Sequence, residues 1–221
     1  MEKFGFIVHP IVAKDFSRKF SFAKSWSDGF VEGIMKYIPP IKVSHITGLE
    51  SDHAEGEGWF VGCPLTSRQF VSLPEPYVIN KIIKAGKLAE KLGAKIVGLG
   101  AFTSVVGDAG VTIAQNLNIP VTTGNSYTVA TALEGVKKAA ELMGLSLDRA
   151  NVLVLGATGS IGAACAHILA QDVRYLTLAA RSEAKLEKVA IQILRSTGLA
   201  VRITANTKSA LKTADVIIAV T

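Results

Sequence analysis

Four apolar runs, separated by helical patterns, dominate the second half of the chain. Val152–Leu155 is a continuous apolar run, as expected for a strand that is buried on both faces of a parallel sheet. Three further strands are predicted, at Tyr175–Ala179, Val201–Ala205 and Asp215–Val220. Helical patterns lie between the strands, at Ser160–Ala170, Ser182–Ser196 and Ser209–Thr213. This alternation predicts an α/β fold with a doubly wound parallel sheet of the Rossmann type.

The first half alternates less regularly but also combines strands with helices. Strands are predicted at Phe4–Val8, Ile41–Ile46, Trp59–Gly62, Lys95–Leu99 and Pro120–Thr122, with a polar turn at Ser51–Gly58. Helices are predicted twice within Val12–Tyr37, then at Pro76–Gly93, at Val111–Leu117 and from Asn125 to Gly144. The last of these carries an apolar stripe of Val129, Leu133, Val136, Ala140 and Met143. The pattern predicts a second α/β domain.

A polar link at Ser146–Ala150 separates the long helix from the strand Val152–Leu155. We therefore predict one α/β domain at residues 1–146 and the Rossmann-type domain at residues 147–221. The chain stops directly after the fourth predicted strand, whereas a full dinucleotide-binding domain has about six. We expect the second domain to be incomplete and the sequence to be a fragment of a longer protein.

A glycine-rich loop lies between the strand Val152–Leu155 and the helix that follows it. The loop consists of Gly156, Ala157, Thr158, Gly159, Ser160, Ile161 and Gly162. Gly156 permits a tight turn, Gly159 lets backbone N–H groups approach a pyrophosphate, and Gly162 lets the helix pack closely. The N-terminus of the helix attracts the phosphates. The strand–loop–helix context predicts a nucleotide site, and a glycine-rich turn without a ligand is the alternative.

The end of the next strand indicates which dinucleotide is bound. NAD sites usually carry Asp or Glu there to accept bonds from the ribose 2′-hydroxyl, but this chain has Ala180, Arg181 and Ser182. An arginine pairs with a 2′-phosphate and a serine donates to it. We therefore predict NADP(H), with Val220 and Thr221 completing the cofactor-binding set. The alternative for Arg181 is a solvent-facing residue at the start of the next helix.

Two polar loops of the first half follow predicted strands and precede helices. Ligands of open α/β sheets bind at the edge where such loops lie, which predicts a substrate cleft facing the cofactor domain. The candidate substrate-binding residues are His9, Thr103, Ser104, Asp108, Thr123, Asn125 and Ser126. Helix capping is the alternative for Asp108 and Asn125.

The sequence assigns no catalytic residue. Cys63 is a candidate nucleophile if its pKa is lowered, although a lone cysteine among apolar residues more often packs, as we expect for Cys165. No pair of histidines has the spacing of metal ligands, so we predict no metal. The G-x-S-x-G pattern of a serine hydrolase is absent from the sequence.

Composition narrows the choice of partners. The chain has 24 Lys and Arg against 18 Asp and Glu, a net charge of +6, without a block of five basic residues. This argues against nucleic acid and is compatible with a phosphate or an acidic partner. A content of 49% hydrophobic residues excludes a disordered chain. No apolar run of about 18 residues and no signal pattern occur, so we expect no integral membrane segment and a cytoplasmic location. A homo-oligomer is compatible with these features.

Three segments together resemble a known family. They are GLGAFTSVVGDAG, PVTTGNSYTVATALEGVKKAAELMG and VLVLGATGSIGAACAHIL, and the opening FGFIVHP adds to the likeness. These segments resemble the long-chain acyl-[acyl-carrier-protein] reductases of cyanobacteria and, more loosely, the NADP enzymes of the shikimate dehydrogenase type. The first resemblance implies an NADPH-dependent reductase in which a cysteine takes the acyl group and hydride then releases an aldehyde. That cysteine lies in a C-terminal region of the family that this sequence lacks, so the role is not transferred to Cys63 or Cys165.

Three hypotheses follow. The first is an NADP(H)-dependent oxidoreductase that reduces a fatty acyl thioester, or a related carbonyl substrate, to an aldehyde. The alternatives are a non-catalytic NADP-binding protein or fragment, and a shikimate-type dehydrogenase, for which Asp108 is a candidate but no matching lysine can be placed. The first hypothesis brings in acyl carrier proteins, which are acidic. A basic stripe on the predicted helix Pro76–Gly93 is a candidate surface for them, formed by Lys81, Lys84, Lys87 and Lys91. A solvated helix face is the alternative.

Overall fold

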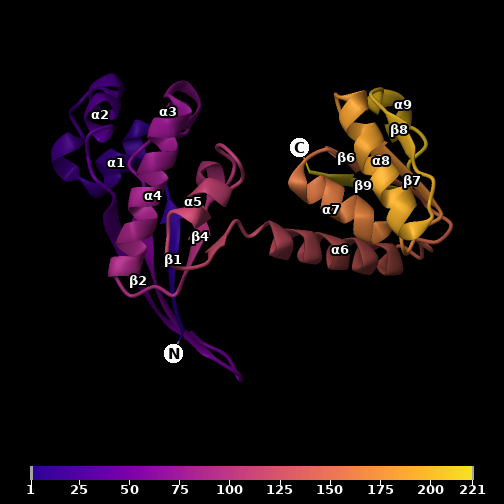
Figure 1. Ribbon diagram of the computed structural model, residues 1–221, viewed down its shortest axis with the longest axis horizontal. Helices are drawn as coiled ribbons and strands as arrows, with labels where there is room; N and C mark the ends of the chain where they lie inside the picture. The colour runs from indigo at the N-terminus through magenta and orange to yellow at the C-terminus, as the bar shows by residue number, and fades with distance from the viewer. Residues whose placement is uncertain (1, 221) are drawn as a thin grey trace. The chain divides into compact units, whose positions relative to one another are not determined.

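The computed structural model describes residues 2–220 of the chain. They form two compact units, which divide between Gly124 and Asn125. Figure 1 shows a sheet with surrounding helices in each unit. Within the described residues no helix is both long and apolar enough to cross a membrane.

The first unit is built on a five-stranded sheet. Its strands are β1 (Glu2–Val8), β2 (Ile41–Glu50), β3 (Glu55–Gly62), β4 (Ile96–Leu99) and β5 (Val121–Thr122). Its helical segments are α1 (Ala13–Lys19), η1 (Ser21–Ala23), α2 (Asp28–Met35), α3 (Ser67–Ser72), α4 (Glu75–Lys91), η2 (Ala101–Ser104) and α5 (Val111–Gln115). The strand order is β2-β3-β1-β4-β5, with β2 antiparallel to β3 and the other pairs parallel. The carboxyl ends of β1, β3, β4 and β5 therefore meet at one edge.

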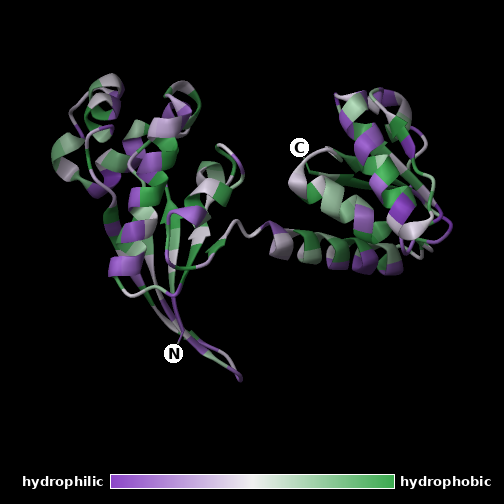
Figure 2. Cartoon of the chain, viewed as in Figure 1, coloured by the Kyte–Doolittle hydropathy of each residue, from purple (hydrophilic) through white to green (hydrophobic). Residues whose placement is uncertain are grey.

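The core of the first unit lies between this sheet and α4. Ile7, Val61 and Val97 point from the strands into the same buried cluster as Val78 and Ile82 of α4. In Figure 2 the part of the sheet beside α4 is coloured mainly as hydrophobic, the far end of the β2–β3 hairpin is largely pale or hydrophilic, and α4 alternates between hydrophobic and hydrophilic residues. The apolar side of an amphipathic helix thus covers one face of the sheet.

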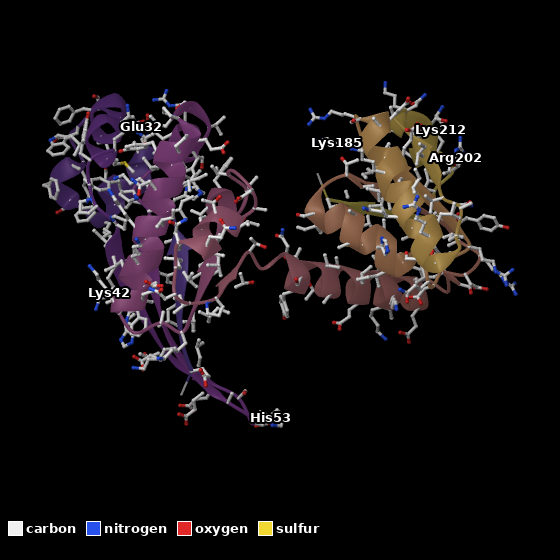
Figure 3. The ribbon with its side chains drawn as sticks, viewed as in Figure 1. Glu32, Lys42, His53, Lys185, Arg202 and Lys212 are labelled. Carbon is white, nitrogen blue, oxygen red and sulfur yellow. The ribbon has the colours of Figure 1, made fainter. Side chains whose placement is uncertain are left out.

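Two features of the first unit differ from the sequence prediction. The residues predicted as a turn at Ser51–Gly58 include the start of β3, because Glu50 pairs with Glu55 in an antiparallel hairpin. His53 lies at the tip of this hairpin (Figure 3). Backbone pairing stabilises such a hairpin without an alternating apolar pattern, so periodicity did not reveal it. The second feature is α3, which the sequence analysis did not predict.

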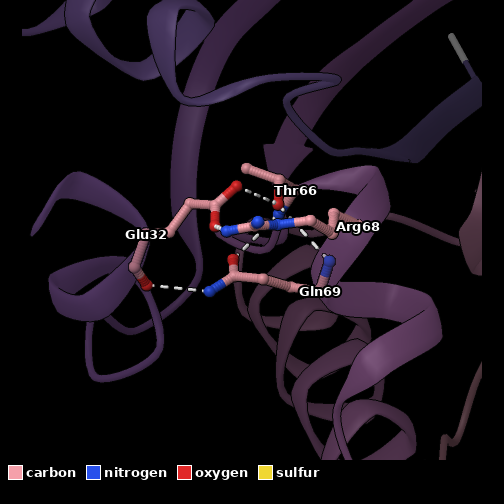
Figure 4. Close-up of polar contacts among 4 residues, drawn as sticks. All are labelled: Glu32, Thr66, Arg68 and Gln69. Atoms are coloured by element: carbon pink, nitrogen blue, oxygen red, sulfur yellow. Dashed lines mark hydrogen bonds and ion pairs between the residues drawn. The ribbon is translucent and has the colours of Figure 1, made fainter. Parts of the chain in front are cut away.

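A polar cluster attaches α3 to α2 (Figure 4). The Thr66 side chain accepts a bond from the Gln69 N–H, and the Gln69 side chain accepts from the Thr66 N–H, which forms a capping box. Glu32 of α2 accepts a bond of 3.1 Å from the Thr66 hydroxyl and forms an ion pair with Arg68. The Gln69 amide donates to the Glu32 carbonyl oxygen at 2.8 Å. The capping pattern of Thr66 and Gln69 was visible in the sequence, whereas the role of Glu32 was not.

The second unit contains the predicted doubly wound sheet. Its elements are α6 (Asn125–Leu142), β6 (Asn151–Leu155), α7 (Ser160–Leu169), β7 (Tyr175–Ala179), α8 (Glu183–Thr197), β8 (Arg202–Thr204), α9 (Thr207–Leu211) and β9 (Val216–Ala219). The strand order is β8-β7-β6-β9 and all pairs are parallel. The predicted fold class is therefore confirmed. The strands after β6 are added first on one side of it, as β7 and β8, and then on the other side, as β9, so the strand order reverses between β6 and β9.

Successive residues of β6 enter two different cores, which is the alternation expected of a strand. Val152 and Val154 belong to a cluster that includes residues of α6, α7 and α8. Leu153 belongs to a smaller cluster with Ala210 of α9 on the opposite face. Helices therefore cover both faces of this sheet.

The helix α6 belongs to the second unit, although it was predicted as the end of the first domain. Val129 and Leu133 share a buried cluster with Cys165 of α7, so the structural division lies at Gly124 and not at the polar link Ser146–Ala150. Met143, which was predicted on the apolar stripe, is 75% exposed because the packed part of the helix ends before it. Periodicity shows which face of a helix is apolar, but not which domain that face contacts. The role of the first unit as a substrate domain stays a prediction.

Candidate cofactor and substrate sites

The glycine loop is a tight turn between β6 and α7. Gly156 has a φ of +80°, a backbone conformation that residues with a Cβ atom rarely adopt. Its N–H donates to the Ala179 carbonyl oxygen at 2.9 Å, and the Gly159 N–H donates to the Gly156 carbonyl oxygen at 3.0 Å. The loop is therefore bonded to the end of β7 on one side and closes on itself on the other. The helix α7 begins directly after it, at Ser160.

Gly159 and Gly162 have different surroundings. A Cβ atom on Gly162 would lie 2.3 Å from the Gly156 carbonyl oxygen and 2.9 Å from the Val220 side chain. Gly162 is thus required for α7 to pack against the loop. A Cβ atom on Gly159 would meet only the Gly156 carbonyl oxygen, at 3.4 Å. The packing of the protein therefore does not require a glycine at this position. The missing side chain leaves space in front of the loop for a ligand.

A crevice of about 640 Å³ lies at the carboxyl ends of β6 and β7. Six of the residues predicted to bind the cofactor line it, namely Gly156, Thr158, Gly159, Arg181, Ser182 and Val220. Six others complete its wall, namely Leu155, Ala179, Ala180, Lys185, Ala205 and Thr207. A crevice at the carboxyl ends of parallel strands, beside the point where strand order reverses, is where open α/β sheets bind ligands.

The other predicted loop residues do not line the crevice. Ala157 is fully buried in the core of the unit. Ser160 is exposed and its hydroxyl oxygen is bonded to Asn125. Ile161 packs partly buried on the same core, and Gly162 faces the loop backbone. Thr221 lies outside the described residues.

The charge of the crevice is positive. Arg181 and Lys185 line it, both are exposed, and neither forms an ion pair with another residue in the range 2–220. Among residues 2–220, no Asp or Glu belongs to its wall. Lys185 lies in the first turn of α8 (Figure 3). Lys185 was not among the predicted cofactor residues, which ended with Ser182 on this side of the site; the available signal was a basic residue in the first turn of the next helix.

His9 lies at the carboxyl end of β1 as a neutral ring. Its Nδ1–H donates to the Pro10 carbonyl oxygen at 3.0 Å, and its Nε2 accepts from the Phe102 N–H at 3.3 Å. The ring centroids of Phe70 and Phe102 lie 4.6 and 5.8 Å away. Burial lowers the pKa of His9, which agrees with this pairing. Both ring nitrogens are occupied, so His9 connects the end of β1 to the segment η2.

His9 and Cys63 share a small apolar cavity of about 170 Å³. Most of its wall is apolar and comes from β1, α1, β2 and the end of β3, including Val8, Phe16, Phe20, Ile41 and Val43. The Cys63 thiol is buried, and this burial raises its pKa to about 12, despite the opposing effect of the Lys81 charge. Burial also raises the pKa of Cys165. Neither thiol is set up as a nucleophile, which favours the packing interpretation.

Three other candidates stabilise the loop after β4. The Thr103 hydroxyl is buried and donates to the Gly100 carbonyl oxygen at 2.8 Å, and the Ser104 hydroxyl donates to Ala101 at 2.7 Å. The Asp108 carboxylate accepts from the N–H and the hydroxyl of Thr112, and these bonds lower its pKa. The Asp108 carboxylate thus bonds to the first turn of α5, which favours the helix-capping alternative, although Gly110 holds the N-cap position itself.

The same loop holds strained backbone. Ala101 and Ala109 have φ angles of +50° and +56°, which residues with a Cβ atom rarely adopt. Such strain is concentrated at functional sites. The loop lies at the edge of the sheet that carries His9 and Cys63.

The remaining candidates lie where the two units join along the chain. Thr123 belongs to the first unit, and Asn125 and Ser126 to the second. The Asn125 amide donates to the Ser160 hydroxyl oxygen at 3.0 Å. The structure thus brings a predicted substrate residue into contact with a residue of the predicted cofactor loop. Within residues 2–220, no group of three or more His, Cys, Asp or Glu side chains is placed to hold a metal ion.

The basic stripe on α4 contains three lysines and not four. Lys81 is only 7% exposed, and its ammonium group donates to the Ile38 carbonyl oxygen at 2.6 Å. Burial lowers its pKa. Helical spacing placed Lys81 with the others, but the chain after α2 covers it. Lys84, Lys87 and Lys91 are exposed and line a shallow hollow with Pro39, Pro40 and Leu88.

Comparison with known proteins identifies the second unit. Residues 152–220 match the family described as the saccharopine dehydrogenase NADP binding domain. The solved structure of quinate dehydrogenase from Corynebacterium glutamicum in complex with NAD is similar to this chain along its whole length. Its TM-score is 0.50 at 15% identity, and the match covers 100% of this chain and 70% of that one. This second likeness concerns the fold. The strand order, the glycine loop and the matched family define the second unit as a nicotinamide dinucleotide-binding domain.

Two curated proteins are similar in sequence. The long-chain acyl-[acyl-carrier-protein] reductase of Synechococcus elongatus is 28% identical over 195 residues, which are 83% of this chain and 56% of the relative. The aminotransferase PigE of Serratia sp. is 26% identical over 176 residues, 76% of this chain and 20% of the relative. The chain thus spans about half of one relative and a fifth of the other.

Proposed function

We propose that this protein is an NADP(H)-dependent oxidoreductase. The observation that carries the proposal is the crevice at the carboxyl ends of β6 and β7, which combines a glycine loop with two unpaired cations. Gly156, Thr158 and Gly159 contact the pyrophosphate of the cofactor, where the N-terminus of α7 adds favourable electrostatics. The bound cofactor supplies or accepts a hydride.

The same crevice distinguishes NADP(H) from NAD(H). Arg181 and Lys185 bind the 2′-phosphate through charge-assisted hydrogen bonds, and the Ser182 hydroxyl donates a further one. A carboxylate at this position would repel that phosphate, and the crevice wall contains none. The NADP-binding family matched by residues 152–220 supports this assignment.

For the substrate we propose a fatty acyl thioester, which two electrons and two protons convert to an aldehyde and a free thiol. The similarity to an acyl-[acyl-carrier-protein] reductase supports this class, and so does the apolar cavity beside His9 in the first unit. That cavity suits hydrocarbon and offers no activated thiol, because the pKa of Cys63 is about 12. We assign substrate binding to the first unit and no catalytic residue to the described part of the chain.

Turnover of NADPH tests this proposal. We expect the protein to oxidise NADPH in the presence of a long-chain acyl thioester, with one aldehyde and one thiol released per NADPH. Replacing Cys63 by Ser should leave the rate within about twofold of the wild-type rate, since a thiol with this pKa is protonated at neutral pH. Loss of activity in Cys63→Ser, with folding retained, would contradict the packing role. Failure of the wild-type protein to bind NADPH would overturn the function itself.

The lysines of α4 give a second test, which concerns the partner. Acyl carrier proteins are acidic, and Lys84, Lys87 and Lys91 form an exposed basic surface. Replacing Lys84 and Lys87 by Glu should slow association with an acyl carrier protein at least several-fold at low salt. The difference should nearly vanish at high salt, because exposed charges are screened beyond about 10 Å at 0.1 M.

A matched control separates this surface from overall charge. The double variant Lys188→Glu and Lys212→Glu makes the same change in net charge at exposed positions of the second unit (Lys212 is labelled in Figure 3). We expect a much smaller effect on the association rate. Equal effects of the two double variants would show that α4 is only a solvated surface.

A further inference from the structure

The first residue of α6 contacts the first residue of α7. The Asn125 amide nitrogen lies 3.0 Å from the Ser160 hydroxyl oxygen and donates to it. The two helices pack on one another, since Val129 and Leu133 share a buried cluster with Cys165 and other residues of α7. Their N-terminal ends are therefore held together beside the glycine loop.

The direction of this hydrogen bond determines what Ser160 can do. A hydroxyl group has one proton and accepts through its oxygen. Because the oxygen accepts from Asn125, the Ser160 proton is directed elsewhere, and none of the hydrogen bonds within residues 2–220 uses it as the donor. Ser160 is exposed and directly follows Gly159, which lines the crevice. This proton lies one residue beyond the crevice wall, at the N-terminus of α7, which is the end of a helix that favours an anionic group.

We propose that Asn125 is a positioning residue of the cofactor site, which turns the Ser160 hydroxyl so that it donates to the cofactor's pyrophosphate. This inference rests on the proposed cofactor function. Phosphate oxygens only accept hydrogen bonds, so a serine with its donor directed outward suits them. An acceptor in place of the Asn125 amide would take the Ser160 proton and turn it away from the cofactor.

A double-mutant cycle tests the proposal in NADP(H) binding. Asn125→Ala should weaken binding about three- to tenfold, the effect of a neutral hydrogen bond. Asn125→Asp should weaken it more, because the carboxylate accepts the Ser160 proton and adds a negative charge near the pyrophosphate. In the Ser160→Ala background, Asn125→Ala should change the affinity less than twofold. Ser160→Thr, which retains the hydroxyl, should restore the sensitivity to Asn125.

Stability measurements distinguish positioning from a structural role. The increase in melting temperature that NADP(H) causes should be smaller in Asn125→Ala than in the wild type, whatever the melting temperatures of the two proteins without cofactor. Asn116→Ala serves as the control. The Asn116 amide, at the C-terminal end of α5, donates to the Thr112 carbonyl oxygen in the first unit, so its loss should leave cofactor affinity unchanged.

Two negative results have different meanings. If the wild-type protein binds NADP(H) and the effects of Asn125→Ala and Ser160→Ala are additive, the positioning role is wrong while the cofactor site stands. If the wild-type protein does not bind NADP(H), the proposed function is wrong and the inference fails with it.

Discussion

Replacing Gly159 by Val should abolish NADP(H) binding and leave the fold intact. Gly159 has φ and ψ of −80° and 162°, an extended conformation that valine adopts without strain. On the protein side, the added Cβ atom meets only the Gly156 carbonyl oxygen, at 3.4 Å. The remainder of the side chain therefore enters the crevice, in the space that the pyrophosphate requires. Calorimetric titration should show no saturation, while circular dichroism matches the wild type.

Gly162→Ala is the matched control for this experiment. Its Cβ atom would lie 2.3 Å from the Gly156 carbonyl oxygen, so the loop and α7 must separate. We expect a loss of about 1–3 kcal/mol in the free energy of unfolding, the usual cost of overpacking. The two variants thus separate a glycine that serves the ligand from one that serves the fold. Wild-type affinity in Gly159→Val would show that the dinucleotide binds elsewhere.

The sheet of the second unit could be predicted because its strands are buried on both faces. A short, continuous apolar run such as Val152–Leu155 is typical of a buried strand, and it forms most of β6. The strand β7 has the bounds that were predicted for it. The glycine loop and Arg181 were recognisable for a similar reason, since their positions follow from the strand ends alone. In such a fold the local sequence pattern locates the strands, and the ends of the strands locate the binding loops.

What the sequence did not reveal depends on contacts between distant segments. Lys81 has the spacing of an exposed lysine, but its ammonium group is covered by the chain that carries Ile38. Asn125 looks like a helix cap, and its contact with Ser160 exists only because α6 packs on α7. The ring nitrogens of His9 are occupied by backbone groups that no local pattern indicates. The partners of Lys81 and Asn125, and the Phe102 N–H that His9 accepts, are far away in the sequence, so periodicity carries no information about them.

The cationic crevice indicates its ligand more specifically than the apolar cavity does. The crevice combines features that each favour a dinucleotide phosphate, and these features lie close together in the second unit. The cavity beside His9 and Cys63 defines an apolar environment without a reactive group. Cofactor binding is therefore the more sharply testable part of the proposed function.

Replacing Arg181 by Ala should remove most of the preference for NADPH over NADH. Arg181 is exposed in the crevice without an ion-pair partner among residues 2–220, so its guanidinium group is available to the 2′-phosphate. Loss of a charge-assisted bond should weaken NADPH binding about 10- to 100-fold and leave NADH binding nearly unchanged. Lys185→Ala should act in the same direction with a smaller effect, because a lysine binds phosphate as a point charge and not through a bidentate fork.

Titration of both cofactors at two salt concentrations completes this test. The NADPH preference of the wild type should fall as salt rises, since the interaction is between exposed charges. Arg202→Ala is the control, because Arg202 lies on β8 of the same unit but lines a different cavity, away from the glycine loop (Figure 3). It should change neither affinity by more than about twofold. Equal affinity of the wild-type protein for NADH and NADPH would refute the role of Arg181, because the 2′-phosphate is the only group that it is proposed to distinguish.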